Sequence, residues 1–143
     1  MQLGTYKCRY AEAGTFEVRV TVKNGTGGTI YTVVKRVTVR SAAEHIASVR
    51  AVYTNLTDRL KAGDKSGALN MFFSHAQVKY GEIFTALGAN LAIAARQLGA
   101  IAVVNAGDEN AEVVVVRTVA GQQQSFLVCL LRGEDGIWRI ESM

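Results

Sequence analysis

Three runs in the last third of the chain decide its fold: Ala111-Glu-Val-Val-Val-Val-Arg-Thr-Val119, Ser125-Phe-Leu-Val-Cys-Leu-Leu-Arg132 and Ile137-Trp-Arg-Ile-Glu141. β-Branched and aromatic residues fill these runs, whereas the turn residues of Ala120-Gly121-Gln122 and Glu134-Asp135-Gly136 stand between them. This order is typical of an antiparallel meander of three strands between Gly99 and Met143. The residues upstream of Gly99 must therefore supply whatever covers the sheet.

Three helices are predicted upstream of this meander. The capping box Ser41-Ala-Ala-Glu44 begins the first helix, whose apolar residues recur at steps of three and four until Gly63 ends it. Asp64 caps a shorter second helix over 65–73, and a second capping box, Ser74-His-Ala-Gln77, begins the third. Helices followed by strands predict an α+β fold, a curved antiparallel sheet packed on three helices. The apolar stripes place five side chains in its core: Val49, Leu56, Phe72, Phe84 and Trp138.

Residues 1–41 form a separate β-hairpin arm in this prediction, ahead of a domain over 42–143. Thr15-Phe-Glu-Val-Arg-Val-Thr-Val-Lys23 alternates between apolar and polar residues, and Asn24-Gly25 is a strong hairpin signal. The return strand, over 29–40, changes the phase of its apolar residues midway, which predicts a bulge near Lys35-Arg36.

The first 40 residues resemble the closing half of a polycystic kidney disease (PKD) repeat. The resemblance is carried by Tyr10-Ala-Glu-Ala-Gly-Thr-Phe-Glu-Val-Arg-Val-Thr-Val22, a glycine-rich turn and Val37-Thr-Val39. The family is an immunoglobulin-like sandwich, usually extracellular and adhesive, whose opening half with its Trp-Asp-Phe-Gly-Asp-Gly signature is missing here. Over residues 5–40 the resemblance implies an incomplete sandwich, and it suggests a secreted or cell-envelope protein.

Residues 42–143 resemble the nuclear transport factor 2-like superfamily. The resemblance is carried by Leu60-Lys-Ala-Gly-Asp-Lys-Ser-Gly-Ala-Leu69, Phe73, Tyr80-Gly-Glu-Ile-Phe84 and Asp135-Gly-Ile-Trp-Arg-Ile140. It implies an α+β cone, a strongly bent sheet around a long helix. The superfamily includes dehydratases and ketosteroid isomerases as well as binding and dimerisation modules without catalytic activity.

Composition places limits on the function. The chain has 143 residues, of which 49% are hydrophobic, and no apolar run approaches the ~20 residues of a membrane helix. Its first residues lack the order of a secretory signal. Cys8 and Cys129 lie far apart in strand-like runs, so we expect two buried free thiols rather than a disulfide.

The positive charge of the chain gathers at its N-terminal end. Residues 1–41 hold seven lysines and arginines against two glutamates, while the whole chain has a net charge of +4. Such an arm could bind an anionic partner, but solvated strand faces explain the charges more simply. No aromatic residues interleave with the charges on their polar face, so nucleic-acid binding is not favoured.

Few polar residues are candidates for a site inside the cone. Tyr53 and Tyr80 could aim their hydroxyl groups inward, and His75, at a helix start, is a candidate for a base, so these three are the candidate catalytic residues. Tyr53, Phe84 and Trp138 are the expected walls of a pocket. No metal or cofactor is expected, because His45 and His75 both lie in first helical turns and no phosphate-binding loop is present.

These observations favour a non-enzymatic module that binds a small apolar ligand in the cone or associates with another protein. Its β elements are expected to make a homodimer. The apolar face of the arm needs another surface: either the cone or the same hairpin of a second molecule, which the open strand edges favour. The alternative is a dehydratase- or isomerase-type enzyme that uses Tyr53, Tyr80 or His75.

Overall fold

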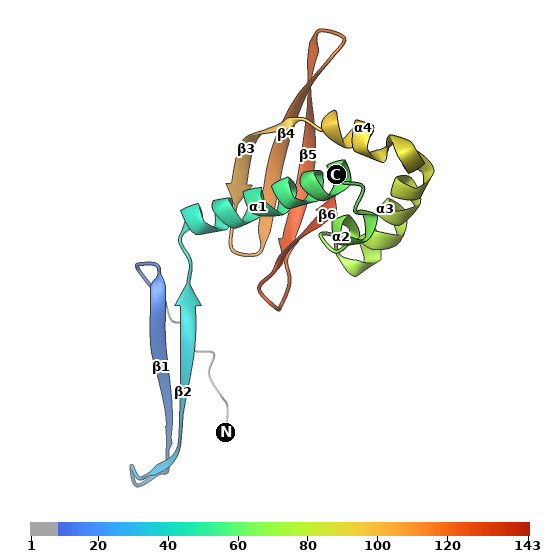
Figure 1. The fold of residues 1–143 in the computed structure, drawn as a ribbon. Helices are drawn as coiled ribbons and strands as arrows, with labels where there is room; N and C mark the ends of the chain where they lie inside the picture. The colour runs from blue at the N-terminus through green and yellow to red at the C-terminus, as the bar shows by residue number, and fades with distance from the viewer. Residues whose placement is uncertain (1–8) are drawn as a thin grey trace. The chain divides into compact units, whose positions relative to one another are not determined.

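The computed structural model describes residues 9–143, with the backbone alone at Val103. The chain divides after Ser41 into two compact units, Met1–Ser41 and Ala42–Met143. A two-stranded hairpin makes up the described part of the first unit, and the second unit combines helices with a four-stranded antiparallel sheet (Figure 1). The predicted α+β fold class with an N-terminal hairpin is therefore confirmed.

The hairpin pairs β1 (Gly14–Lys23) with β2 (Thr29–Val39). Its register runs without interruption from Gly14 opposite Val39 to Val22 opposite Tyr31, and shifts only at Val22/Lys23, next to the turn. The predicted bulge near Lys35-Arg36 is therefore wrong. The change of phase in β2 instead reflects apolar residues on both faces of the strand, with Val33 and Val37 on one face and Ile30 and Val34 on the other.

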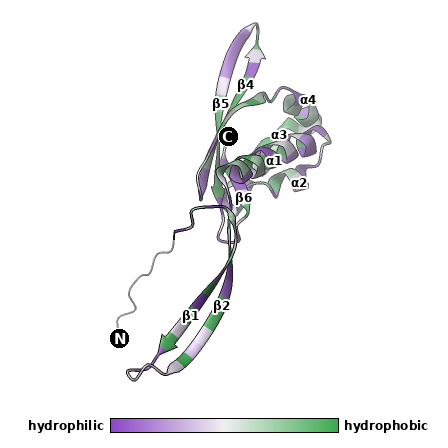
Figure 2. Cartoon of the chain, turned by 90° about the vertical axis from the view of Figure 1, so that its left-hand side faces the viewer, coloured by the Kyte–Doolittle hydropathy of each residue, from purple (hydrophilic) through white to green (hydrophobic). Residues whose placement is uncertain are grey.

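Opposed residues of an antiparallel pair share a face, so the register defines the apolar face of the hairpin. Apolar and polar residues alternate along β1, and the residues of β2 that oppose its apolar positions are apolar at all but one position (Figure 2). Between Gly14 and Val39, Lys35 is the only charged residue on the apolar face, where Val20 and Tyr31 are 50% and 56% exposed. We define the apolar hairpin face by its eight large apolar residues: Phe16, Val18, Val20, Val22, Tyr31, Val33, Val37 and Val39.

The long helix α1 (Ala42–Lys61) begins directly after Ser41, as predicted, and Gly63 follows it with a φ of 76°. Asp64 caps α2 (Lys65–Leu69): its carboxylate accepts a hydrogen bond of 2.8 Å from the backbone N–H of Gly67. The Arg59 guanidinium also donates to this carboxylate, at 2.6 Å. The bond from Gly67 and, to a smaller extent, the bond from Arg59 hold the pKa of Asp64 below its ordinary value. The prediction of Asp64 as a cap is confirmed.

The second helix is shorter than predicted, because a tertiary contact replaces its last turn. Phe72 forms an isolated parallel bridge with Ile140 of β6 (Trp138–Ser142). The Ile140 N–H donates to the Met71 carbonyl at 2.8 Å, and the Phe73 N–H donates to the Ile140 carbonyl at 3.1 Å. The chain between the helices is thereby bound to the end of the sheet.

Helix α3 (Ser74–Leu87) has Phe73, not Ser74, as its N-cap, and no side chain makes a cap hydrogen bond. The predicted capping box at Ser74 is therefore wrong. The Gln77 side chain donates instead to the Phe72 carbonyl at 3.1 Å. Two short elements follow the break at Gly88: the 3-10 helix η1 (Gly88–Asn90) and α4 (Leu91–Arg96).

The sheet has four strands in sequence order, one more than the sequence predicted. The unpredicted strand is β3 (Ala100–Ala106), which pairs with β4 (Asn110–Val119). Strand β5 (Gln122–Arg132) also starts three residues early, since Gln122–Gln124 pair with the end of β4. Figure 1 shows α1 lying across one face of this sheet, an arrangement consistent with the cone implied by the family resemblance.

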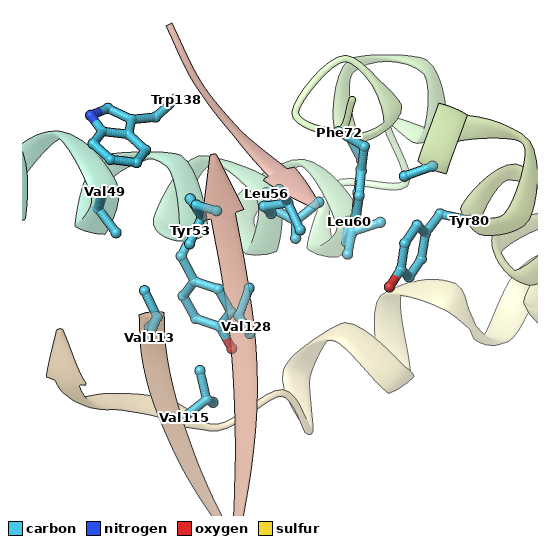
Figure 3. Close-up of a cluster of buried hydrophobic side chains, with 14 of the residues drawn as sticks. Val49, Tyr53, Leu56, Leu60, Phe72, Tyr80, Val113, Val115, Val128 and Trp138 are labelled. Atoms are coloured by element: carbon cyan, nitrogen blue, oxygen red, sulfur yellow. The ribbon is translucent and has the colours of Figure 1, made fainter. Parts of the chain in front are cut away.

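The core lies between α1, the inner face of the sheet and the aromatic residues that follow α2 (Figure 3). All five side chains predicted for the core are buried, with exposed fractions of 0–4%. Cys129 is a free, half-buried thiol, and Cys8 lies outside the described residues. The largest fully buried side chains are Phe72, Leu56, Leu130, Ile140, Val49 and Val113.

We expect Asp135 to make the stability of the turn before β6 depend on pH. Arg139 donates to its carboxylate at 2.7 Å and the Ile137 N–H at 3.0 Å, and these bonds lower the pKa of Asp135 to about 2. A lowered pKa stabilises the fold above the unfolded value of about 4, and the contribution is lost as pH falls toward 2. Urea midpoints of the wild type and Asp135→Asn should therefore differ at pH 7 and converge near pH 2. A difference of constant size would contradict this assignment.

Candidate functional site

An apolar cavity of about 240 Å³ lies where α1, α3 and α4 meet. Helix α3 contributes Tyr80 and Phe84 from its buried stripe, and α4 contributes the small residues Ala94 and Ala95. Small residues on α4 leave room beside the aromatic rings. We call this the helix cavity; its lining residues are Leu60, Tyr80, Ile83, Phe84, Leu87, Leu91, Ala94, Ala95, Leu98 and Met143.

A second apolar cavity, of about 100 Å³, lies between α1 and strands β4 and β5. It shares Leu98 and Met143 with the helix cavity, so the two cavities adjoin at these residues. We call it the sheet cavity; its lining residues are Tyr53, Leu98, Gly99, Val115, Arg117, Phe126, Val128 and Met143.

A larger and more polar cavity, of about 560 Å³, adjoins the sheet cavity. The two share Leu98, Gly99 and Arg117. Leu98 therefore lines all three cavities. We call this third one the arginine cavity; its lining residues are Arg96, Gln97, Leu98, Gly99, Arg117, Thr118 and Val119.

Tyr53 lies on the buried stripe of α1, and its ring lies close to Val113, Val115 and Val128 of the sheet (Figure 3). Its hydroxyl donates to the Gly99 carbonyl at 3.1 Å, and burial raises the pKa of Tyr53. The hydroxyl proton is therefore held by the backbone, and the oxygen remains available as an acceptor.

Tyr80 is also buried, and its ring stacks on Phe72 with the ring centroids 4.3 Å apart. Its hydroxyl donates to the Met143 carbonyl at 3.0 Å and accepts from the Met143 N–H at 2.8 Å. Both tyrosines thus point inward and line cavities. Their hydroxyl protons, however, are donated to main-chain carbonyl groups.

His75 lies at the surface, apart from the two tyrosines. Its side chain is 63% exposed, and Nε2 lies 2.9 Å from Oε1 of Glu141. The structure therefore does not bring the three candidate residues for catalysis together. Within residues 9–143, no three His, Cys, Asp or Glu side chains gather closely enough to hold a metal ion, and no helix is long and apolar enough to cross a membrane.

The expected pocket walls also separate. Phe84 lines the helix cavity and Tyr53 the sheet cavity, whereas Trp138 is not among the residues that line the three cavities. Trp138 packs edge-on against the buried His45, with ring centroids 6.0 Å apart. Figure 3 shows Trp138 and Tyr80 at opposite ends of the core cluster.

Sequence reasoning missed two residues that shape the cavities, Leu98 and Arg117. Leu98 follows a run of small helical residues, and its position becomes apparent only once β3 turns the chain back along the sheet. Arg117 interrupts the apolar run of β4, which was visible in the sequence as a charge within a buried strand. Arg117 alternates in step with Val113 and Val115, so the sequence already placed its charge on the same face of the strand as these apolar residues.

Comparisons with known proteins do not assign the chain to a family: no family model and no curated protein matches the sequence. Among solved structures, the chain is similar to a Campylobacter jejuni protein that carries the provisional name NTF2-like transpeptidase. The two sequences are 18% identical over 72% of this chain and 100% of that one, with a TM-score of 0.45.

Proposed function

We propose that this protein is a binding module for a small, predominantly apolar ligand. The observation that supports this most is the adjoining pair of apolar cavities, of about 240 and 100 Å³, built from α1, α3, α4 and the sheet. Sites for small molecules are typically concave, largely apolar and equipped with few polar groups. Because the hydroxyl protons of Tyr53 and Tyr80 are held by the backbone, these residues serve binding better than proton transfer.

Binding of an uncharged apolar probe tests this function. We expect decan-1-ol to bind, and Ala94→Phe to weaken that binding at least about tenfold, because the new ring occupies the helix cavity. Titration calorimetry measures the affinity, and circular dichroism checks that the variant is folded. The matched control is Ala47→Phe on the exposed face of α1, which should bind like the wild type. Equal affinity of both variants and the wild type would refute a ligand in the helix cavity.

The apolar hairpin face supports a second part of the proposal, self-association. Eight large apolar residues on a two-stranded sheet form a contiguous surface, and burying its still-exposed apolar area contributes about 25 cal/mol per Å². A second copy of the hairpin offers a matching surface, and two-fold pairing is the commonest closed arrangement. The resemblance of residues 5–40 to half of a PKD sandwich supports the same inference, because such a half normally packs against another sheet.

We expect a homodimer at micromolar concentration, with about twice the 15.4 kDa mass of one chain in light scattering. The double variant Val20→Asp/Val33→Asp should be a monomer, since these opposed residues lie in the middle of the apolar hairpin face. Thr21→Asp/Thr32→Asp changes an opposed pair on the other face and should leave the dimer intact. A monomeric wild type, or a dimer unaffected by the first variant, would contradict the proposal.

A further inference from the structure

We propose that the cavities hold an aliphatic monocarboxylate, with its carboxylate on Arg117 and its chain in the sheet and helix cavities. This inference rests on the proposed function, because it specifies the ligand of the same cavities. It is carried by the state of Arg117, by the charge around it and by the order of the three cavities.

The guanidinium group of Arg117 lies against the Phe126 ring, and its Nε has no hydrogen-bond partner among the described residues. Its Cζ lies 4.4 Å from the centroid of the Phe126 ring, and Nε is buried without a partner among residues 9–143. A guanidinium stacked on an aromatic ring keeps its N–H groups free to donate in its own plane. A buried donor without an acceptor is unfavourable, so an acceptor supplied by a ligand is stabilised here.

The other two arginines in the strands of the sheet, Arg132 and Arg139, already have acceptors. Arg139 lies 2.7 Å from a carboxylate oxygen of Asp135, and Nε of Arg132 donates to the Gly136 carbonyl at 3.1 Å. Within the part of the chain that the structure describes, no carboxylate lies within 4.0 Å of Arg117. A carboxylate matches the guanidinium fork and makes charge-assisted hydrogen bonds to it, so it is the ligand group that Arg117 suits best.

The charge around Arg117 also favours an anion. Arg96 lines the arginine cavity together with Arg117, and the described residues lining that cavity include no acidic side chain. Two cations on the wall of one cavity attract anions and disfavour cationic ligands. A neutral apolar molecule would gain nothing from them.

The order of the cavities sets the direction of the ligand. Arg117 lines both the arginine cavity and the sheet cavity, and Leu98 lines these two and the helix cavity. A molecule anchored at Arg117 therefore extends past Val115 and Phe126 toward the helices. The sheet cavity, at about 100 Å³, has room for only about three water volumes, so it admits an unbranched chain rather than a ring system.

Calorimetric titration of the full protein with three probes that each carry one unbranched ten-carbon chain tests the inference: decanoate, decan-1-ol and decyltrimethylammonium, each below its solubility limit or critical micelle concentration. We expect decanoate to bind at least about tenfold more tightly than decan-1-ol, and the cation to bind least. Arg117→Met should weaken decanoate binding by about tenfold or more and change decan-1-ol binding by less than about twofold. The matched control, Arg50→Gln on the exposed side of α1, should change neither.

The placement of the ligand's alkyl chain is tested by comparing octanoate with decanoate. Each added methylene should tighten binding about fourfold if it enters an apolar cavity. Equal binding of decanoate and decan-1-ol, both insensitive to Arg117→Met, would overturn the inference and leave the proposed function standing. Failure of all three probes to bind would overturn both. Should Arg117→Met not fold, Arg117→Lys replaces it, and unchanged decanoate binding by that variant would count against the guanidinium contact.

Discussion

Phe72→Ala is expected to lower the free energy of unfolding by about 3–5 kcal/mol. The side chain is fully buried, stacks on Tyr80 at 4.3 Å and meets Phe84 edge-on at 6.1 Å. Its backbone also forms the bridge to Ile140, so the surroundings are fixed from the helices and from the sheet. A site held from both sides collapses little around a deleted ring, and the cavity term is therefore large. Urea unfolding followed by circular dichroism measures the loss.

The control for this variant is Phe126→Ala on β5. That ring is 42% exposed, lies against the Arg117 guanidinium and is not one of the buried core residues. Its removal should cost less than about 1.5 kcal/mol, because much of its surface is already in water. Similar losses for both variants would mean that Phe72 is not the centre of the packing between helices and sheet.

Much of the fold could be predicted because single residues dictate local structure. Asp64 caps a helix through its own carboxylate, and Gly63, Gly121 and Gly136 adopt φ values of 76–79° at the turns where the sequence placed them. Strand β3 was missed because its alanines have little β propensity of their own, and pairing with β4 supplies its stability. Local sequence signals do not contain such pairings.

The same distinction explains the outcome for the candidate site. The helical stripe identified Tyr53 and Tyr80 as interior residues, yet their hydroxyl partners, Gly99 and Met143, lie 46 and 63 positions away in the sequence. Arg117 was visible as a charge in an apolar strand. Whether a carboxylate lies within its reach depends on the folding of distant segments, which periodicity does not report.

Gly99→Ala is expected to lower the free energy of unfolding by at least about 3 kcal/mol. A Cβ at this position would overlap the carbonyl group of Val116, which is backbone and cannot rotate away. Either β4 or the start of β3 must shift, and Tyr53, whose hydroxyl donates to the Gly99 carbonyl, would lose its geometry. Because Gly99 lines both the sheet cavity and the arginine cavity, any folded fraction of the variant should also bind decan-1-ol more weakly.

Gly81→Ala is the matched control, and it should act in the opposite direction. Gly81 lies inside α3, and a Cβ there would stand 3.6 Å from the Leu69 side chain, an ordinary contact. Alanine favours the helix over glycine, so this variant should be more stable than the wild type by about 0.5–1 kcal/mol. Urea midpoints that move apart in this way would show that the close approach of two backbone segments, and not a general cost of added methyl groups, requires glycine at position 99. Equal midpoints for the two variants would contradict the packing of β3 against β4 described above.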